Sequence, residues 1–358
     1  MPHRPQLDSL RAFAILIVMV HHYMTHPFVL AGYGVILFFV LSGYFATRGL
    51  LKSRDKIGEG KTVLSEALQL FYSRRYLRIM PIYYLVLIVT LLCGVEYSQR
   101  AFLANATFLS NFAMVHDNEW YGRYSHFWSL AVLEQFYLCW PLAVLLCPRR
   151  WLLKATIAVV ALGPLFRGYC QWCDYTDMHW TLMPLGSVDW LAAGCLLAVC
   201  QHEGVEDRIA RVGAWCGPLV LFFVLIRRFA GWEAPGYAIY VPTLGAVFFL
   251  WLISRARTGF NGSLGWLLDQ KWLAHIGQMS YSIFLLHCFS ELVVPHVGWL
   301  QTILSTDARM FILIPTTVAL AYLAWKFIEQ PIWRLKERLT ANMVARVNQS
   351  QPCPDPVN

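Results

Sequence analysis

Apolar segments recur along most of the chain and are separated by short polar stretches. An α-helix of about 20 apolar residues crosses the hydrocarbon core of a bilayer. Segments of that length occur at 9–28, 29–49, 79–95, 126–147, 152–169, 182–200, 213–230, 236–254, 272–291 and 310–329. We therefore predict an all-α polytopic membrane protein with about ten transmembrane helices.

The distribution of basic residues predicts how these helices are oriented. If the N-terminus is cytoplasmic, 23 of the 29 Lys and Arg residues fall on the cytoplasmic side or at the inner helix ends. Such asymmetry follows the positive-inside rule, and an odd number of spans would abolish it. Both termini should therefore be cytoplasmic. We expect one membrane domain, 1–338, followed by a cytoplasmic disordered tail, 339–358, that is rich in Gln, Asn and Pro.

Composition argues against a typical soluble protein and against a nucleic-acid-binding protein. The chain is 58% hydrophobic and 14% charged, whereas soluble domains are about 45–50% apolar and about 25% charged. Its net charge of +8 lies on no extended polar domain that could bind a duplex, so we expect membrane lipids and no nucleic acid as partners. The ten Cys residues lie mostly in apolar segments. One C-x-x-C pair, Cys170 and Cys173, is weak evidence for a metal or redox site, and no metal site is predicted.

The first span carries two ionisable side chains whose burial needs an explanation. A charge at the centre of a membrane helix costs about 2.5–3.5 kcal/mol on insertion scales. Arg11 and His22 are eleven residues apart, which places them on one helix face about 16 Å apart along the axis. His21 points about 100° away from His22. Either the pair is functional, or Arg11 reaches lipid phosphates while His22 is a hydrogen-bonded core residue.

The fourth span, 126–147, contains Glu134 among aromatic residues. Glu134 lies eight residues below His126, near the depth expected for His22. A carboxylate at that depth could pair with the imidazole, fix its tautomer and raise its basicity. A purely structural pair between two helices would give the same pattern.

Three arginines precede the third span, in FYSRRYLRIMPIYY. Arg74, Arg75 and Arg78 would cluster on a helix at the cytoplasmic surface. Guanidinium groups match phosphate oxygens, so the cluster could bind a phosphorylated cytoplasmic ligand or only lipid head groups. Further polar positions within predicted spans are Ser42, Asp189, His287 and Glu329.

Seven segments, taken in order, carry a family resemblance. They are LDSLRAFAILIVMVHHY, FFVLSGYFATR, FYSRRYLRIMPIYY, HFWSLAVLEQFYLCWP, SVDWLAAGCLLA, MSYSIFLLHCF and FIEQPIWRLK. Together they resemble the integral-membrane acyltransferase 3 family from about residue 7 to residue 337. The resemblance implies a multi-pass O-acyltransferase of the bacterial inner membrane. Its donor substrate would be cytoplasmic acyl-CoA, usually acetyl-CoA, with no permanently bound cofactor. Its acceptor would be a hydroxyl of an envelope, exported or lipid-linked glycan, or in some members a small-molecule metabolite.

The resemblance also implies roles for individual residues. The family's Arg-His motif falls on Arg11 and His22, its catalytic pair, and its arginine cluster for acyl-CoA falls on Arg74, Arg75 and Arg78. Family members usually have a glutamate where this chain has Leu133, so the carboxylate is displaced to Glu134 and turned about 100° around the helix.

Several mechanisms remain open at this stage. We expect His22 to be the general base, steadied by Glu134, and an acylated His22 or Ser42 is the minor variant. His21 and His287 are secondary candidates for the base. A proton-coupled flippase of lipid-linked glycans could instead use His22 and Glu134 as a proton relay, and a non-catalytic scaffold is a third possibility. The sequence leaves the acceptor, the acyl-chain length and the oligomeric state open.

Overall fold

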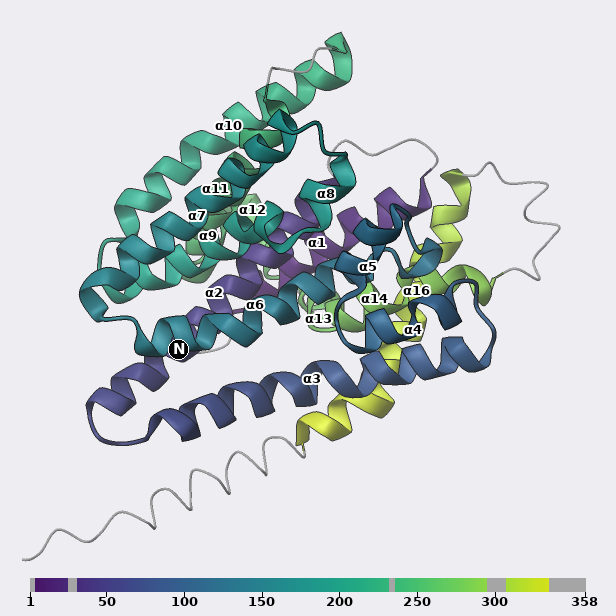
Figure 1. Ribbon diagram of the computed structural model, residues 1–358, viewed down its shortest axis with the longest axis horizontal. Coiled ribbons are helices and arrows are strands. Elements are labelled where there is room, and N and C mark those ends of the chain that lie inside the picture. Colours follow the sequence, from purple (N-terminus) through teal and green to yellow (C-terminus); the bar gives the residue numbers. More distant parts are fainter. Residues whose placement is uncertain (1–3, 25–30, 232–235, 295–306, 335–358) are drawn as a thin grey trace, which may run out of the picture.

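The computed structural model describes residues 4–24, 31–231, 236–294 and 307–334, and within these ranges the chain contains helices and no strand (Figure 1). The helices are α1 (Pro5–Tyr23), α2 (Ala31–Gly58), α3 (Leu64–Leu92), α4 (Ser98–Ala106), α5 (Ser110–Asp117), η1 (Gly122–Tyr124), α6 (Phe127–Leu146), α7 (Arg149–Trp172), α8 (Asp177–Leu182), α9 (Pro184–His202), α10 (Glu206–Ala230), α11 (Tyr237–Thr258), α12 (Gly262–Leu268), α13 (Lys271–Gln278), α14 (Ser280–Leu286), η2 (His287–Leu292), η3 (Asp307–Arg309), α16 (Met310–Ala324) and η4 (Trp325–Glu329).

Eight helices in the described ranges are long and apolar enough to cross a membrane. This confirms an all-α architecture with multiple candidate spans, but it does not confirm the predicted count of about ten. The expected span 9–28 corresponds to α1, which starts earlier and carries Asp8 and Arg11, and its residues 25–28 lie outside the described ranges. The expected span 272–291 is divided among α13, α14 and the 3₁₀ helix η2. A hydropathy window detects apolar composition and cannot detect such a break.

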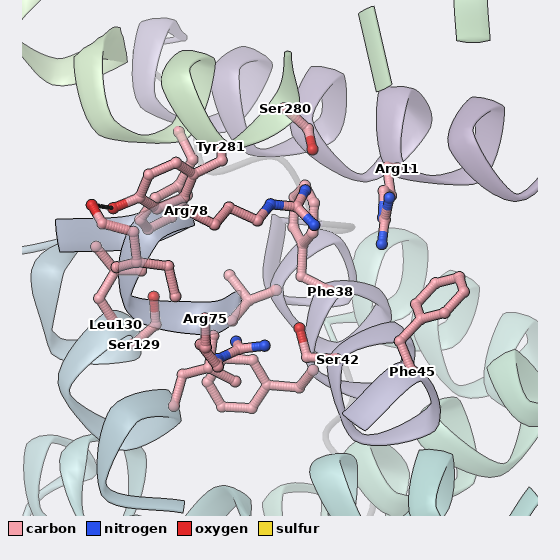
Figure 2. A pocket seen from close by; sticks show the side chains of 15 residues that line it. Arg11, Phe38, Ser42, Phe45, Arg75, Arg78, Ser129, Leu130, Ser280 and Tyr281 are labelled. Carbon is pink, nitrogen blue, oxygen red and sulfur yellow. Dashed lines mark hydrogen bonds between the residues drawn. The ribbon is translucent and has the colours of Figure 1, made fainter. Parts of the chain in front are cut away.

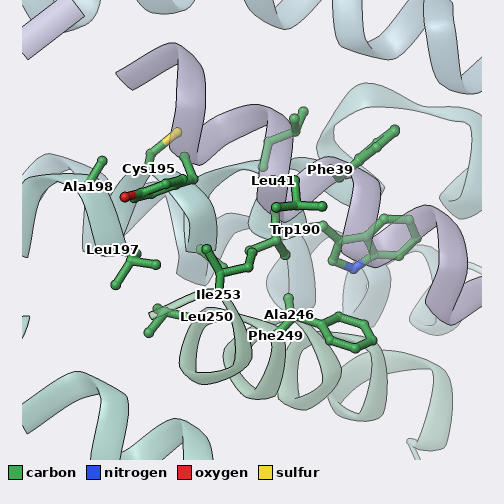
Figure 3. Close-up of a cluster of buried hydrophobic side chains, with 14 of the residues drawn as sticks. Phe39, Leu41, Trp190, Cys195, Leu197, Ala198, Ala246, Phe249, Leu250 and Ile253 are labelled. Atoms are coloured by element: carbon green, nitrogen blue, oxygen red, sulfur yellow. The ribbon is translucent and has the colours of Figure 1, made fainter. Parts of the chain in front are cut away.

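The main apolar core lies between α2, α9 and α11 (Figure 3). Phe39 of α2, Leu191 of α9 and Leu250 of α11 are all buried in it. Glycines let α2 and α9 approach closely: a Cβ atom at Gly43 would overlap the carbonyl of Leu191, and one at Gly194 would overlap the carbonyl of Val40. The two backbones therefore touch, as small residues at membrane helix contacts allow.

A buried ion pair ties α7, α9 and α11 together. Asp189 of α9 accepts two hydrogen bonds from Arg167 of α7, at 3.0 and 2.9 Å. Arg167 also donates to the carbonyl of Ile239 at 2.9 Å and to the hydroxyl of Thr243 at 2.6 Å, both on α11. Because both charges are fully paired, Asp189 has a structural explanation.

Outside this core, α3 runs along one long edge of the molecule, and η4 packs beside it (Figure 1). A second apolar cluster joins α3 to the start of α6 and to η2 through Tyr83, Phe127 and Phe289. Two cavities lie among α1, α2, α3, α6 and α14.

Polar side-chain contacts join neighbouring elements at both ends of the helix bundle. At one end, Asp55 of α2 lies 3.0 Å from His202 of α9. At the other end, Arg123 lies 3.3 Å from Glu291. The last described helix returns toward Arg78, since Arg78 and Glu329 line one small cavity. The predicted tail, 339–358, lies outside the described residues, and the orientation of the termini relative to the cytoplasm stays a prediction.

Candidate active site

One cavity, which we call the arginine cavity, has a volume of about 150 Å³. It lies between α1, α2, α3, α6 and α14, and Figure 2 shows Arg11, Arg75 and Arg78 reaching toward it from α1 and α3. Its polar lining is formed by Arg11, Ser42, Arg75, Arg78, Ser129, Ser280 and Tyr281, and its other lining residues are apolar. The structure thus brings together Arg11, Ser42 and two of the three clustered arginines.

Arg11 and Arg75 are each held in place by neighbouring side chains. The Arg11 guanidinium donates to Asp8 one turn earlier at 3.1 Å and lies 4.7 Å from the centre of the Phe45 ring. The Arg75 guanidinium lies over the ring of Tyr137, 3.0 Å from its centre. Aromatic faces attract cations, so these contacts offset part of the cost of burying the guanidiniums.

Arg74 does not share this position. Its side chain is exposed and does not line the arginine cavity. Arg75 and Arg78 are three residues apart and face the cavity, whereas Arg74 lies about 100° around the helix from Arg75. The expected three-residue cluster is therefore a pair at the cavity, joined there by Arg11.

Glu134 lies beside Arg75 rather than beside His22. The nearest oxygen of the Glu134 carboxylate is 3.8 Å from Nε of Arg75, and the carboxylate is largely buried. Glu134 does not line either cavity, whereas its neighbour Leu133 lines the arginine cavity. The predicted pairing of Glu134 with His22 is wrong in this structure. His126, at the start of α6, lies at the level of His22, and Glu134 follows about 12 Å further along the helix, beside Arg75.

A second cavity, which we call the histidine cavity, has a volume of about 430 Å³. Its lining includes Val18, His21, His22, Trp120, Ser125, His126 and Trp128. His21 thus lines the same cavity as His22, although the helical angle predicted that it would point elsewhere.

His287 lies beside this cavity and packs against two of the three histidines that line it. The ring centre of His287 lies 4.9 Å from that of His22 and 4.7 Å from that of His126. His287 is fully buried, and its Nδ1 lies 2.6 Å from the carbonyl oxygen of Phe284. A carbonyl only accepts, so Nδ1 of the neutral ring carries the proton, and the lone pair of Nε2 faces the Cys288 thiol, 3.3 Å away. His126 was not predicted from the sequence as a site residue and served only to estimate depth. Its place at the start of the fourth span was the available signal.

The two cavities share a wall. Val35 of α2, Ser129 of α6 and Phe284 of α14 line both of them. Arg11 lines one cavity and His22 lines the other, which fits the separation of about 16 Å along α1. A long, thin molecule bound at the arginines would have to pass between these three side chains to reach His22.

Trp120 is positioned in the histidine cavity by the segment that precedes α6. Tyr97 donates to Glu119 at 2.7 Å, and Tyr121 donates to Asp117 at 2.5 Å. These hydrogen bonds lower the pKa of both carboxyl groups below their ordinary values. Arg100 donates to both carboxylates, so the residues on either side of Trp120 are anchored.

Comparison with known proteins identifies the class of the chain. A family model described as "Acyltransferase domain" matches residues 4–326, so the chain belongs to the acyltransferase 3 family. This confirms the resemblance drawn from the seven sequence segments. Together with the eight apolar helices, it makes the chain a multi-pass membrane protein.

Similar curated proteins are named as O-acetyltransferases. A peptidoglycan O-acetyltransferase, OatA, from Listeria monocytogenes is 26% identical over 92% of this chain and 55% of its own length. The O-acetyltransferase OatA of Staphylococcus aureus strain NCTC 8325 is 25% identical over 92% of this chain and 57% of its own length. The chain thus spans little more than half of these relatives. No solved structure matches it significantly.

Proposed function

We propose that the protein is an O-acyltransferase of the bacterial inner membrane. It moves an acyl group, usually acetyl, from cytoplasmic acyl-CoA to a hydroxyl of an envelope, exported or lipid-linked glycan. The observation that carries this proposal is the wall of three side chains shared by the arginine and histidine cavities. This arrangement supports a donor bound in the arginine cavity and a general base, His22, in the adjacent histidine cavity.

The arginine cavity suits the phosphate-bearing end of acyl-CoA. Arg75 and Arg78, together with Arg11, present guanidinium groups that bind phosphate oxygens by charge-assisted hydrogen bonds. The positive-inside distribution of basic residues supports a cytoplasmic position for this end. The pantetheine arm then extends past Val35 and Phe284 and presents the thioester near His22.

At His22, the imidazole acts as the general base. It removes the proton from the acceptor hydroxyl as the oxygen attacks the thioester carbonyl carbon. The new carbon–oxygen bond forms, the carbon–sulfur bond breaks, and CoA leaves as a thiolate that takes the proton from the imidazolium. His287 packs against His22 and limits the orientation of its ring.

Glu134 takes a supporting role in this mechanism. Its carboxylate faces Arg75 and so favours the charged, oriented guanidinium in the donor cavity. It is not part of the proton path at His22. Because Glu134 faces Arg75, this arrangement does not support the His22–Glu134 relay on which the flippase alternative depended.

The histidine cavity suits a sugar acceptor. Trp120 and Trp128 line it and offer aromatic surfaces on which a sugar ring can pack. The relative from Listeria monocytogenes is named for peptidoglycan O-acetylation, which makes envelope glycan fragments the first acceptors to test.

Incubation of the purified protein with labelled acetyl-CoA and candidate glycans tests the proposal. We expect CoA release that depends on the acceptor, together with label in the glycan. Glycan movement across reconstituted vesicles without CoA release would support the flippase instead.

A further inference from the structure

A cysteine stands next to the imidazoles of the histidine cavity. His22 at the end of α1 and His287 and Cys288 at the start of η2 have ligand atoms that all lie within 4.8 Å of one another. The Cys288 Sγ atom is 3.3 Å from Nε2 of His287. Two nitrogens and one sulfur are therefore close enough to converge on one ion after small rotations of the side chains.

His287 is already oriented as a metal ligand. Its Nδ1 donates to the carbonyl of Phe284, so Nε2 is unprotonated and directed toward Cys288. Histidines that ligate metals commonly donate their other ring N–H to a carbonyl or carboxylate, which fixes the tautomer and the ring. This orientation exists without any change in the backbone.

A fourth donor lies beside this group. His126 is 4% exposed, and its ring nitrogens make no hydrogen bond of good geometry with the described residues, although the backbone of Arg123 and Leu285 lies near them. Its ring centre is 4.7 Å from that of His287, and its side chain lines the histidine cavity together with His22. A buried imidazole whose nitrogens are incompletely satisfied is unfavourable, and coordination would satisfy one of them.

We propose that His22, His287 and Cys288 bind a divalent transition-metal ion of the Zn²⁺ type, with His126 adjacent to the fourth position. Imidazole and thiolate ligands suit Zn²⁺ and Co²⁺ and do not suit Mg²⁺ or Ca²⁺. On binding, the Cys288 thiol loses its proton to solvent water, and the thiolate forms the bond to the ion.

Metal binding would also regulate transfer, and this part rests on the proposed function. A lone pair of His22 that is bound to an ion cannot accept the acceptor's proton. Zn²⁺ should therefore inhibit the acyltransferase. Cys288 takes no part in the proposed transfer, so Cys288→Ser should retain activity and require about tenfold or more Zn²⁺ for the same inhibition.

Titration of the full-length protein in detergent with Co²⁺ tests the site directly. We expect saturable binding of one ion with a thiolate-to-Co²⁺ charge-transfer band, and displacement of that ion by Zn²⁺. Cys288→Ser should abolish the band, and His287→Ala should weaken binding about tenfold or more. The matched control is Cys173→Ser, which removes an exposed thiol at the end of α7 and should change nothing.

The outcomes separate the two proposals. Absence of a band, or a band that persists in Cys288→Ser, overturns the metal site and leaves the acyltransferase proposal intact. A Cys288-dependent band without inhibition at the same ion concentration keeps the metal site and contradicts the role of His22 as the base.

Discussion

At the scale of single residues, a comparison of two adjacent histidines tests which one is the general base. His21 and His22 both line the histidine cavity, but the ring of His22 is the one that packs against His287. We expect His22→Ala to lower the rate of transfer by about 10²–10⁴, the usual contribution of a positioned base. His21→Ala should lose much less. Measurement of kcat for both variants checks this, and a larger loss at His21 would reassign the base.

Arg74 and Arg78 form a similar contrast in the donor cavity. Arg78 lines the arginine cavity, while Arg74 is exposed outside it. Loss of a charge-assisted hydrogen bond costs about 1.5–3 kcal/mol, so Arg78→Ala should weaken acyl-CoA binding about 10- to 150-fold. Arg74→Ala should have little effect. Equal losses in the apparent affinity for acyl-CoA would instead indicate a diffuse electrostatic role for both.

Helical periodicity relates residues within one helix and was of limited use even there. It predicts that Arg11 and His22 share one face, and they line two adjacent cavities, but His21 lines the cavity of His22 as well. It does not give the rotation of one helix against the next. The depth estimated across helices also failed: His126 lines the cavity of His22, whereas Glu134, predicted at that depth, lies about 12 Å further along α6 beside Arg75. His287 meets His22 because η2 ends a segment whose break the sequence did not reveal.

At the scale of elements, the contact between α2 and α9 depends on glycines, which have no side chain to separate the two backbones. A Cβ atom at Gly194 of α9 would overlap the Val40 carbonyl of α2. A Cβ atom at Gly49 of α2 would meet no atom within 4 Å. Overpacking of this kind costs about 1–3 kcal/mol. Gly194→Ala should therefore lower the unfolding temperature in detergent. Gly49→Ala should leave it unchanged or raise it, since Ala favours a helix.

The segment before α6 should loosen in acid. Hydrogen bonds lower the pKa of Asp117 and Glu119 from the ordinary values of 3.8 and 4.5. Folded groups with lowered pKa contribute stability that is complete above the ordinary values and is lost as the pH falls through the lower folded values. Amide hydrogen exchange, corrected for its intrinsic rate, should thus show less protection of 98–121 at about pH 3.5 than at pH 7. The Tyr97→Phe variant should shift the loss at Glu119 to higher pH, and an unchanged profile would contradict the assignment.

Hydropathy predicted the existence of most elements and could not predict their continuity. The second to eighth predicted spans and the last all correspond to helices that qualify by length and composition. The ninth is interrupted after Gln278, and a Cβ atom at the preceding Gly277 would overlap the Asp8 carbonyl of α1. The close approach of α13 to α1 beside this break is a tertiary contact that no window along the chain contains.

At the scale of the whole molecule, the orientation in the membrane determines which substrate reaches which cavity. The end that carries Asp55 and His202 belongs to the basic side of the bundle, which includes the turn at Lys61. The opposite end carries Glu119 and the exposed Cys173. Positive-inside asymmetry over 23 of the 29 basic residues predicts that the first end is cytoplasmic.

Cysteine labelling in intact cells tests this orientation. In variants that keep one cysteine at a time, a membrane-impermeant maleimide added outside should label Cys173. It should label a Lys61→Cys variant only after the cells are opened. This arrangement would admit acyl-CoA to the arginine cavity from the cytoplasm and the acceptor to His22 from outside. The reverse labelling pattern would direct the arginines away from the cytoplasmic acyl-CoA pool, and the proposed direction of transfer would then be untenable.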